Sequence, residues 1–124
     1  MTPFSMSRDI NGFNGFGLVF SDTKYSATIA QSTDTTITIG GTSAMGGMAN
    51  NGGHRYLMVF NFEPGSQVWV ANNATAAVPA GATFASTSSE MNPSAREVRE
   101  GDVIHFFTPD SGGAAVSVVV YALL

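Results

Sequence analysis

Apolar residues along this chain collect in short runs, and clusters of Gly, Pro, Asn and Ser separate the runs. The repeat of about three to four residues that marks an amphipathic helix is nearly absent. Residues 35–39 instead alternate threonine with isoleucine, a pattern that gives a strand one buried face and one face in water. Short runs rich in β-branched and aromatic residues predict an all-β fold, either a small antiparallel β-sandwich or a jelly-roll-like barrel.

Two pairs of runs predict β-hairpins, because a short turn sequence lies between the members of each pair. In the first pair, residues 55–62 and 67–71 flank Glu63-Pro64-Gly65-Ser66. Proline presets the backbone at the second position of a turn, and glycine accepts a positive φ at the third. In the second pair, residues 103–108 and 115–123 flank a turn rich in Gly, Ser and Asp.

The run over residues 115–123 is apolar at successive positions, and therefore on both faces of the strand that it predicts. We expect this strand to lie centrally in its sheet, with other parts of the protein over both faces. Further strands are expected over residues 18–20, 25–29 and, at a sheet edge, 83–86, with a polar loop over residues 87–95.

Two segments do not fit inside a compact sandwich. Residues 1–17 are too rich in glycine for a helix and too aromatic for a solvated tail, so they predict an extended N-terminal arm before a single β-domain over residues 18–124. Residues 40–53 predict a long glycine-rich loop that is either mobile or ordered by a partner. The apolar anchors expected in these segments are Phe4, Phe13, Phe16, Met45 and Met48.

The composition narrows the classes of partner. The chain has 124 residues, enough for one domain with one core, and only 11% of them are charged, below the typical ~25%. The net charge of −4 argues against binding to nucleic acid or to an anionic membrane. The longest apolar stretch is shorter than the ~20 residues of a membrane helix, and the start of the chain does not resemble a signal peptide. We therefore expect no membrane partner and a cytosolic origin.

Residues that carry catalytic or metal chemistry are sparse. The chain has no cysteine, and its two histidines, His54 and His105, stand in none of the spacings that preassemble a metal site. Three carboxylates that lie close together in sequence could instead form a calcium site, but we expect them to pair with two neighbouring arginines. These residues are Glu97, Glu100, Asp102, Arg96 and Arg99. We expect a protein that is not an enzyme and that needs no metal or cofactor.

Trp69 is the single tryptophan, and its sequence neighbours predict which way it faces. Val68 and Val70 share one face of the strand and fit the core, so Trp69 is expected on the outward face. An outward tryptophan fits packing against a second sheet or a protein interface, and it also fits stacking on a sugar ring beside Asn72 and Asn73. The sequence leaves these interpretations open.

From residue 54 onward the chain resembles the small β-sandwich or jelly-roll proteins that coat the capsids of tailed bacteriophages. The segments that carry the resemblance are HRYLMVFNFEPGSQVWVANN, AVPAGATF, REGDVIHFFTP and GGAAVSVVVYALL. They contain an N-x-x-P-G-type turn, a V-P-A-G turn, a G-D-x-I strand entry and a final valine-rich strand. The resemblance implies a capsid decoration (cement) protein or a minor head protein that assembles on the virion in the bacterial cytosol.

We accordingly expect a structural protein that binds the major capsid protein and reinforces the shell across subunit joints. The arm, the glycine-rich loop and Trp69 are its expected contacts, and the few surface charges predict a homo-oligomer, with a trimer as the expected form. The alternative is a carbohydrate-binding or host-recognition module of a virion. Its expected platform is Trp69, Asn72, Asn73 and Tyr56. An enzyme of cupin-like form ranks last.

Overall fold

The computed structural model describes residues 2–3, 7–8, 11, 14–15, 20–21, 24–39, 55–81 and 83–123. All regular secondary structure in these residues is β-strand, so the predicted all-β class is confirmed. No helix in this part of the chain is long and apolar enough to cross a membrane. The strands are β1 (Thr2–Pro3), β2 (Ser7–Arg8), β3 (Asn14–Gly15), β4 (Lys24–Ile29), β5 (Thr35–Thr38), β6 (Arg55–Phe62), β7 (Trp69–Asn72), β8 (Glu90–Met91), β9 (Ala95–Arg99), β10 (Val103–Phe107) and β11 (Ala114–Leu123).

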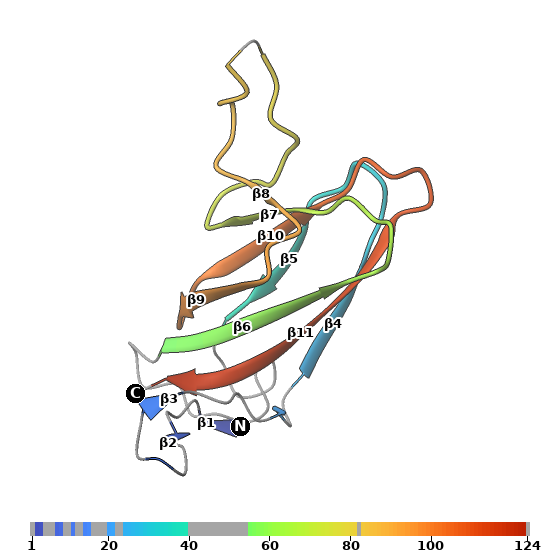
Figure 1. Ribbon diagram of the computed structural model, residues 1–124. Helices are drawn as coiled ribbons and strands as arrows, with labels where there is room; N and C mark the ends of the chain where they lie inside the picture. Colours follow the sequence, from blue (N-terminus) through green and yellow to red (C-terminus); the bar gives the residue numbers. More distant parts are fainter. Residues whose placement is uncertain are drawn as a thin grey trace.

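The longer strands form a sandwich of two sheets (Figure 1). Sheet one contains β4, β11, β6 and β9 in that order, and β1 continues it beside the end of β11. Sheet two contains β5, β10, β7 and β8, while β2 and β3 pair separately. From β4 onward the chain alternates between the sheets, except that β7 and β8 are neighbours in sheet two. This is the strand arrangement of a jelly roll, and the antiparallel sandwich predicted from the sequence is confirmed.

The two predicted hairpins are wrong, although their strands exist. β6 pairs with β11 and β9 in sheet one, whereas β7 pairs with β10 and β8 in sheet two. The turn between them forms as predicted, since the Ser66 N–H donates to the Glu63 carbonyl at 3.0 Å and Gly65 has φ +79°. β10 and β11 are split between the sheets in the same way. A turn sequence specifies a reversal but not which sheet the next strand joins, so both connections are arches between sheets.

Hydrogen bonds fasten the two arches to each other. The Thr108 hydroxyl, which is fully buried, donates to the Gln67 carbonyl at 2.7 Å. The Gln67 N–H in turn donates to the Asp110 carboxylate at 2.9 Å. Both bonds satisfy backbone groups of Gln67, which lies outside the strands. Backbone groups in a connection between sheets need such partners where they are shielded from water.

The core lies between the sheets and follows the two-residue repeat of the strands. Val116, Val118 and Val120 of β11 are buried and belong to this core. The central position predicted for β11 is confirmed, because β4 and β6 flank it. Phe60 of sheet one meets Phe106 of sheet two edge-on, with ring centroids 6.3 Å apart. Further core residues are Ile29, Ile37, Ile39, Tyr56, Met58, Val68, Val70, Val98 and Ile104.

The other strand predictions are confirmed only in part. The strands expected over residues 25–29 and 35–39 exist as β4 and β5, and Ile37 and Ile39 are buried as the alternation predicts. No strand forms over residues 83–86, where Phe84 has a φ of +56° that strand geometry does not allow. The expected polar loop over residues 87–95 contains β8 and the first residue of β9. Residues 18 and 19 lie outside the described residues.

The expected apolar anchors of the arm and the glycine-rich loop also lie outside the described residues. They are Phe4, Phe13, Phe16, Met45 and Met48. The first described piece of the arm is β1, whose two residues pair in parallel with Tyr121 and Ala122 of β11. The beginning of the chain therefore contributes backbone pairing to sheet one.

Candidate functional site

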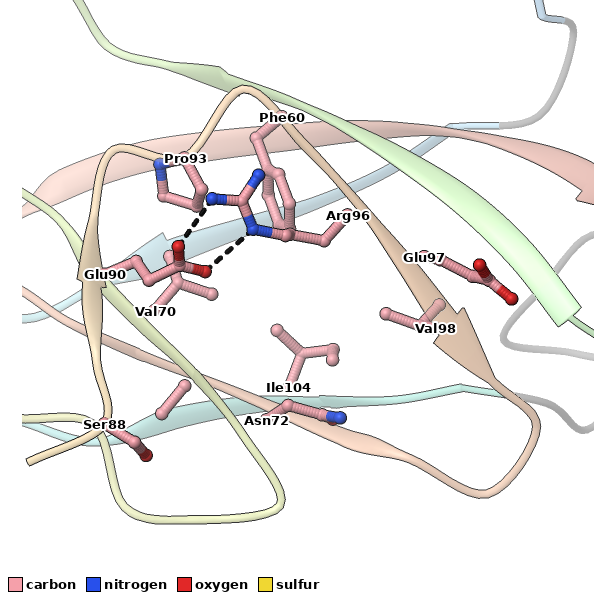
Figure 2. Close-up of a pocket in the computed structure, with 11 residues that line it drawn as sticks. Phe60, Val70, Asn72, Ser88, Glu90, Pro93, Arg96, Glu97, Val98 and Ile104 are labelled. Atoms are coloured by element: carbon pink, nitrogen blue, oxygen red, sulfur yellow. Dashed lines mark hydrogen bonds and ion pairs between the residues drawn. The ribbon is translucent and has the colours of Figure 1, made fainter.

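A pocket opens between the two sheets, where β9 of sheet one faces β7 and β8 of sheet two (Figure 2). We call it the edge pocket. Its volume is about 370 Å³, which lies within the range of small-molecule sites. Its floor consists of core side chains, namely Phe60, Val70, Val98 and Ile104. The remaining lining residues are Ala71, Asn72, Ser88, Glu90, Pro93, Arg96 and Glu97.

The edge pocket exists because β8 is shorter than the strands around it. β8 has two residues, which pair with Trp69 and Val70 only. β7 continues to Asn72, beyond its pairing with β8, and β9 in the other sheet has five residues. Ala71 and Asn72 pair with β10 on one side, but in the described part of the chain no strand pairs with them on the side of β8. The space between the sheets therefore reaches the surface at this edge.

An ion pair between Glu90 and Arg96 closes one side of the edge pocket and joins the two sheets. Strand register places Glu90 opposite the core residue Val70, and Arg96 opposite the core residue Met58, so both side chains start from inward-facing positions. The Arg96 Nε–H donates to Glu90 Oε2 at 2.8 Å, and Nη2–H donates to Oε1 at 2.5 Å. This two-bond geometry, visible in Figure 2, orients the guanidinium and the carboxylate in one plane.

The ion pair shifts the pKa values of both of its members. The hydrogen bonds from Arg96 lower the pKa of Glu90, against a smaller opposing effect of burial, and the charge of Arg96 lowers it further. The same hydrogen bonds raise the pKa of Arg96. Each side chain remains about half exposed, with 50% of Arg96 and 51% of Glu90 accessible. The pair is thus ionised and open to solvent at neutral pH.

Asn72 forms the opposite wall of the edge pocket, and it belongs to a small polar network. Asp102 accepts hydrogen bonds from the Asn72 amide at 3.3 Å, the Asn73 amide at 3.1 Å and the Arg99 N–H at 2.9 Å. Burial opposes ionisation of Asp102, but these bonds and the charge of Arg99 outweigh it and lower the pKa of this carboxyl. The side-chain oxygen Oδ1 of Asn73 accepts from the Val103 N–H at 2.8 Å. The network fixes the Asn72 side chain at the pocket wall.

The partners that the sequence predicted for Arg96 are wrong. Arg96 pairs with Glu90 across a turn, and Glu97 pairs with Arg55 of β6 at 2.9 Å. The reason is strand alternation, which puts Arg96 on the inward face of β9 and Glu97 on the outward face. The sequence signal that could have predicted the Glu90–Arg96 pair is Asn92-Pro93-Ser94, which forms a turn between two short extended segments.

The three carboxylates of the calcium alternative do not converge on one point. Glu97 turns to Arg55, and Asp102 accepts from neighbouring amides. Both carboxylate oxygens of Glu100 are buried without a hydrogen-bond partner. Over the described residues there is no group of three or more His, Cys, Asp or Glu side chains that could hold a metal ion.

The expected exposure of Trp69 is wrong. The alternation was read correctly, because Val68 and Val70 belong to the core between the sheets, but Trp69 is only 7% exposed. The connection between β7 and β8 covers the outward face of the strand, and the Phe84 ring meets the indole edge-on at 6.2 Å. Tyr56 is 1% exposed, and burial together with the charge of Glu100 raises its pKa. Both aromatic side chains of the predicted sugar-binding platform, Trp69 and Tyr56, are therefore buried and do not offer a surface for stacking.

A histidine–aspartate pair fixes the same connection to sheet two. The Nδ1 atom of His105, on β10, lies 2.7 Å from Asp34 Oδ2. The other carboxylate oxygen of Asp34 accepts a hydrogen bond from the Ala76 N–H at 3.2 Å, and Ala76 is buried. His105 therefore has a structural partner, as a histidine within a strand commonly does. The other histidine, His54, lies outside the described residues.

Two exposed apolar side chains flank the buried Trp69. Phe84 is 60% exposed and Met91 is 53% exposed. Met91 lies directly opposite Trp69 in the β7–β8 pairing, and Phe84 contacts the indole from the connecting segment. We call the two exposed side chains that flank Trp69, Phe84 and Met91, the apolar surface of sheet two. The segment that carries Phe84 projects beyond the sheets in Figure 1.

Comparisons with known proteins give no match. No family model matches the chain, and neither a search of curated proteins nor a search of solved structures found a similar protein.

Proposed function

We propose that this protein is a non-enzymatic structural component of a bacteriophage virion, which binds the major capsid protein and reinforces the shell. It acts on the capsid surface after assembly in the host cytoplasm. The jelly-roll topology supports the proposal, because this architecture is widely used in viral shells, and so does the resemblance of residues 54 onward to capsid-coating proteins. The composition agrees, since a chain with 11% charged residues depends on apolar and backbone contacts for association.

The observation that carries the proposal is the apolar surface of sheet two. Phe84 and Met91 each expose more than half of their surface. Aromatic and methionine side chains are enriched at protein interfaces and depleted elsewhere on surfaces. Phe84 also adopts a positive φ that is unfavourable for a residue with a Cβ atom, so the fold maintains its exposed position at a cost. We infer that this surface contacts the capsid.

Self-association belongs to the same proposal. A symmetric oligomer, with a trimer as the expected form, would place several apolar surfaces of sheet two on one capsid axis. The predicted anchors Phe4, Phe13, Phe16, Met45 and Met48 remain proposed contacts of this assembly. Light scattering of the purified chain measures its oligomeric state, and a monomer at all concentrations contradicts this part of the proposal.

Sedimentation with emptied phage heads tests capsid binding. The heads come from the phage whose genome encodes the chain, and bound protein is measured in the pellet. Wild-type protein should sediment with the heads, and the double variant Phe84→Ser, Met91→Ser should remain in the supernatant. The control Phe20→Ser removes a fully exposed phenylalanine outside sheet two and should bind as wild type does. Absence of wild-type protein from the pellet contradicts the proposal.

A further inference from the structure

We propose that the edge pocket binds a neutral sugar residue. This function goes beyond capsid binding and rests on different residues, because none of Phe84, Met91 and Trp69 lines the pocket. A virion surface protein with such a pocket attaches to glycans as well as to the shell. The ligand class follows from the charge, the hydrogen-bonding groups and the apolar floor of the pocket.

The charges that line the edge pocket cancel. Its ionic residues are Glu90, Arg96 and Glu97. Glu90 and Arg96 neutralise each other through two hydrogen bonds, and Glu97 is paired with Arg55. An anionic ligand would have to displace Glu90 from Arg96, and a cationic ligand would have to displace Arg96 from Glu90. The pocket therefore favours a ligand without net charge.

The rim of the edge pocket offers both donors and acceptors of hydrogen bonds. Each oxygen of Glu90 accepts one bond from Arg96 and keeps a further acceptor site. The side-chain amide N–H of Asn72 donates to Asp102, and its side-chain oxygen Oδ1 and the Ser88 hydroxyl have no hydrogen bond in the described part of the chain. A hydroxyl group both donates and accepts, so a polyol satisfies this mixed rim. A hydrocarbon would leave these polar groups without water and without partners.

The floor of the edge pocket is apolar and rigid. Phe60 packs against the nearly parallel ring of Phe62, with centroids 5.8 Å apart, and makes an edge contact with Phe106 at 6.3 Å. Val98 and Ile104 complete the floor toward Asn72, as Figure 2 shows. One face of a sugar ring consists of C–H groups, which pack against such a floor while the hydroxyls reach the rim. A pre-formed apolar floor with a few fixed polar groups is the usual composition of a small-ligand site.

Titration of the full chain followed by NMR tests the proposal. The probes are glucose, galactose and N-acetylglucosamine, and the observed signals are the Arg96 Nε–H and the backbone amides of Glu90 and Val98. At least one sugar should shift these signals in a saturable way. Ser88→Ala and Asn72→Ala should each weaken that binding by about five- to tenfold, because each removes one hydrogen-bonding group. Lys24→Gln, on β4 at the opposite edge of sheet one, is the matched control and should bind as wild type does.

The sugar site is overturned if none of the three sugars shifts the Arg96 and Val98 signals. It is also overturned if octanoate, an amphipathic anion, shifts them at a lower concentration than any of the three sugars. Sedimentation of Ser88→Ala with emptied heads separates the two proposals, because this variant should still bind heads. Loss of sugar binding and loss of capsid binding are thus independent outcomes.

Discussion

Gly113 shows how one position of the fold restricts its side chain. It has φ +73°, and a Cβ atom there would lie 2.5 Å from the Ile29 carbonyl oxygen, which belongs to the backbone of β4. Gly113→Ala should therefore lower the free energy of unfolding by about 1–3 kcal/mol, measured by urea denaturation. The neighbour Gly112 has no atom within 4 Å of its ideal Cβ, so Gly112→Ala should change stability by less than about 0.5 kcal/mol. Equal effects of the two variants would contradict the described turn.

Glu90 is a residue whose contribution to stability should depend on pH. Arg96 lowers its pKa below the ordinary value of 4.5. A carboxyl with a lowered pKa in the folded state stabilises the protein above its ordinary pKa, and this stabilisation disappears as the pH falls through the lowered value. Because both side chains are half exposed, Glu90→Gln should cost at most about 1 kcal/mol at pH 7 and nothing in strong acid.

Urea denaturation across a pH series measures this dependence. The same Glu90→Gln change should have no effect in an Arg96→Gln background, where the partner is absent. A cost that stays constant with pH, or that persists without Arg96, would show that the ion pair does not supply it.

Trp69 marks the limit of prediction at the level of one residue. Strand alternation with Val68 and Val70 gives its direction correctly. Its burial depends on the connection between β7 and β8. In that connection Phe84, which is distant from Trp69 in sequence, contacts the indole, and the Ala76 N–H donates to Asp34. Such cover is a non-local property, and a two-residue repeat contains no information about it.

At the level of elements, Thr108 tests how the two arches hold together. Its hydroxyl donates to the Gln67 carbonyl at 2.7 Å and accepts from the Asp110 N–H at 3.2 Å. Thr108→Val keeps the size of the side chain but removes the hydrogen-bond partner of two partly buried backbone groups, so it should cost about 1–3 kcal/mol of unfolding free energy. Thr108→Ser retains the hydroxyl and loses one methyl group, so its cost should be about 1 kcal/mol or less. If urea denaturation shows that Thr108→Ser is less stable than Thr108→Val, the proposed role of the hydroxyl is contradicted.

The strands themselves were predictable, but their partners were not. β4, β5, β6 and β11 follow from β-branched and aromatic runs with a clear repeat. The turn at Pro64 and Gly65 was also read correctly, yet it joins two sheets rather than two paired strands. Pairing is set by contacts between residues far apart in sequence, and local turn chemistry is compatible with both a hairpin and an arch.

The edge pocket could not be predicted for the same reason. It arises where β8, a two-residue strand inside a segment expected to be loop, pairs with only the first part of β7. Of the residues that the sequence offered for metal, ion-pair or sugar chemistry, only Asn72, Arg96 and Glu97 line it. Glu90, which forms the central ion pair, carries no sequence signal beyond its place before a proline-containing turn.

At the level of the whole molecule, removal of the N-terminal arm separates folding from assembly. β1 adds two residues of parallel pairing to β11, whereas the described core is built from β4 to β11. A chain that begins at Leu18 should therefore keep a cooperative β-type unfolding transition and lose binding to emptied heads or self-association. Circular dichroism, light scattering and sedimentation measure these three properties. A shortened chain that does not fold would show that the arm is part of the core.

The central claim is that the protein is a structural part of a phage capsid, and quantitative mass spectrometry of purified virions tests it most directly. Peptides of this chain are counted against peptides of the major capsid protein in the same particles. The account predicts a constant ratio that corresponds to occupation of one class of symmetry axis or subunit joint of the shell. Absence of the chain from purified virions, or a ratio that varies between preparations and disappears on washing, would contradict it.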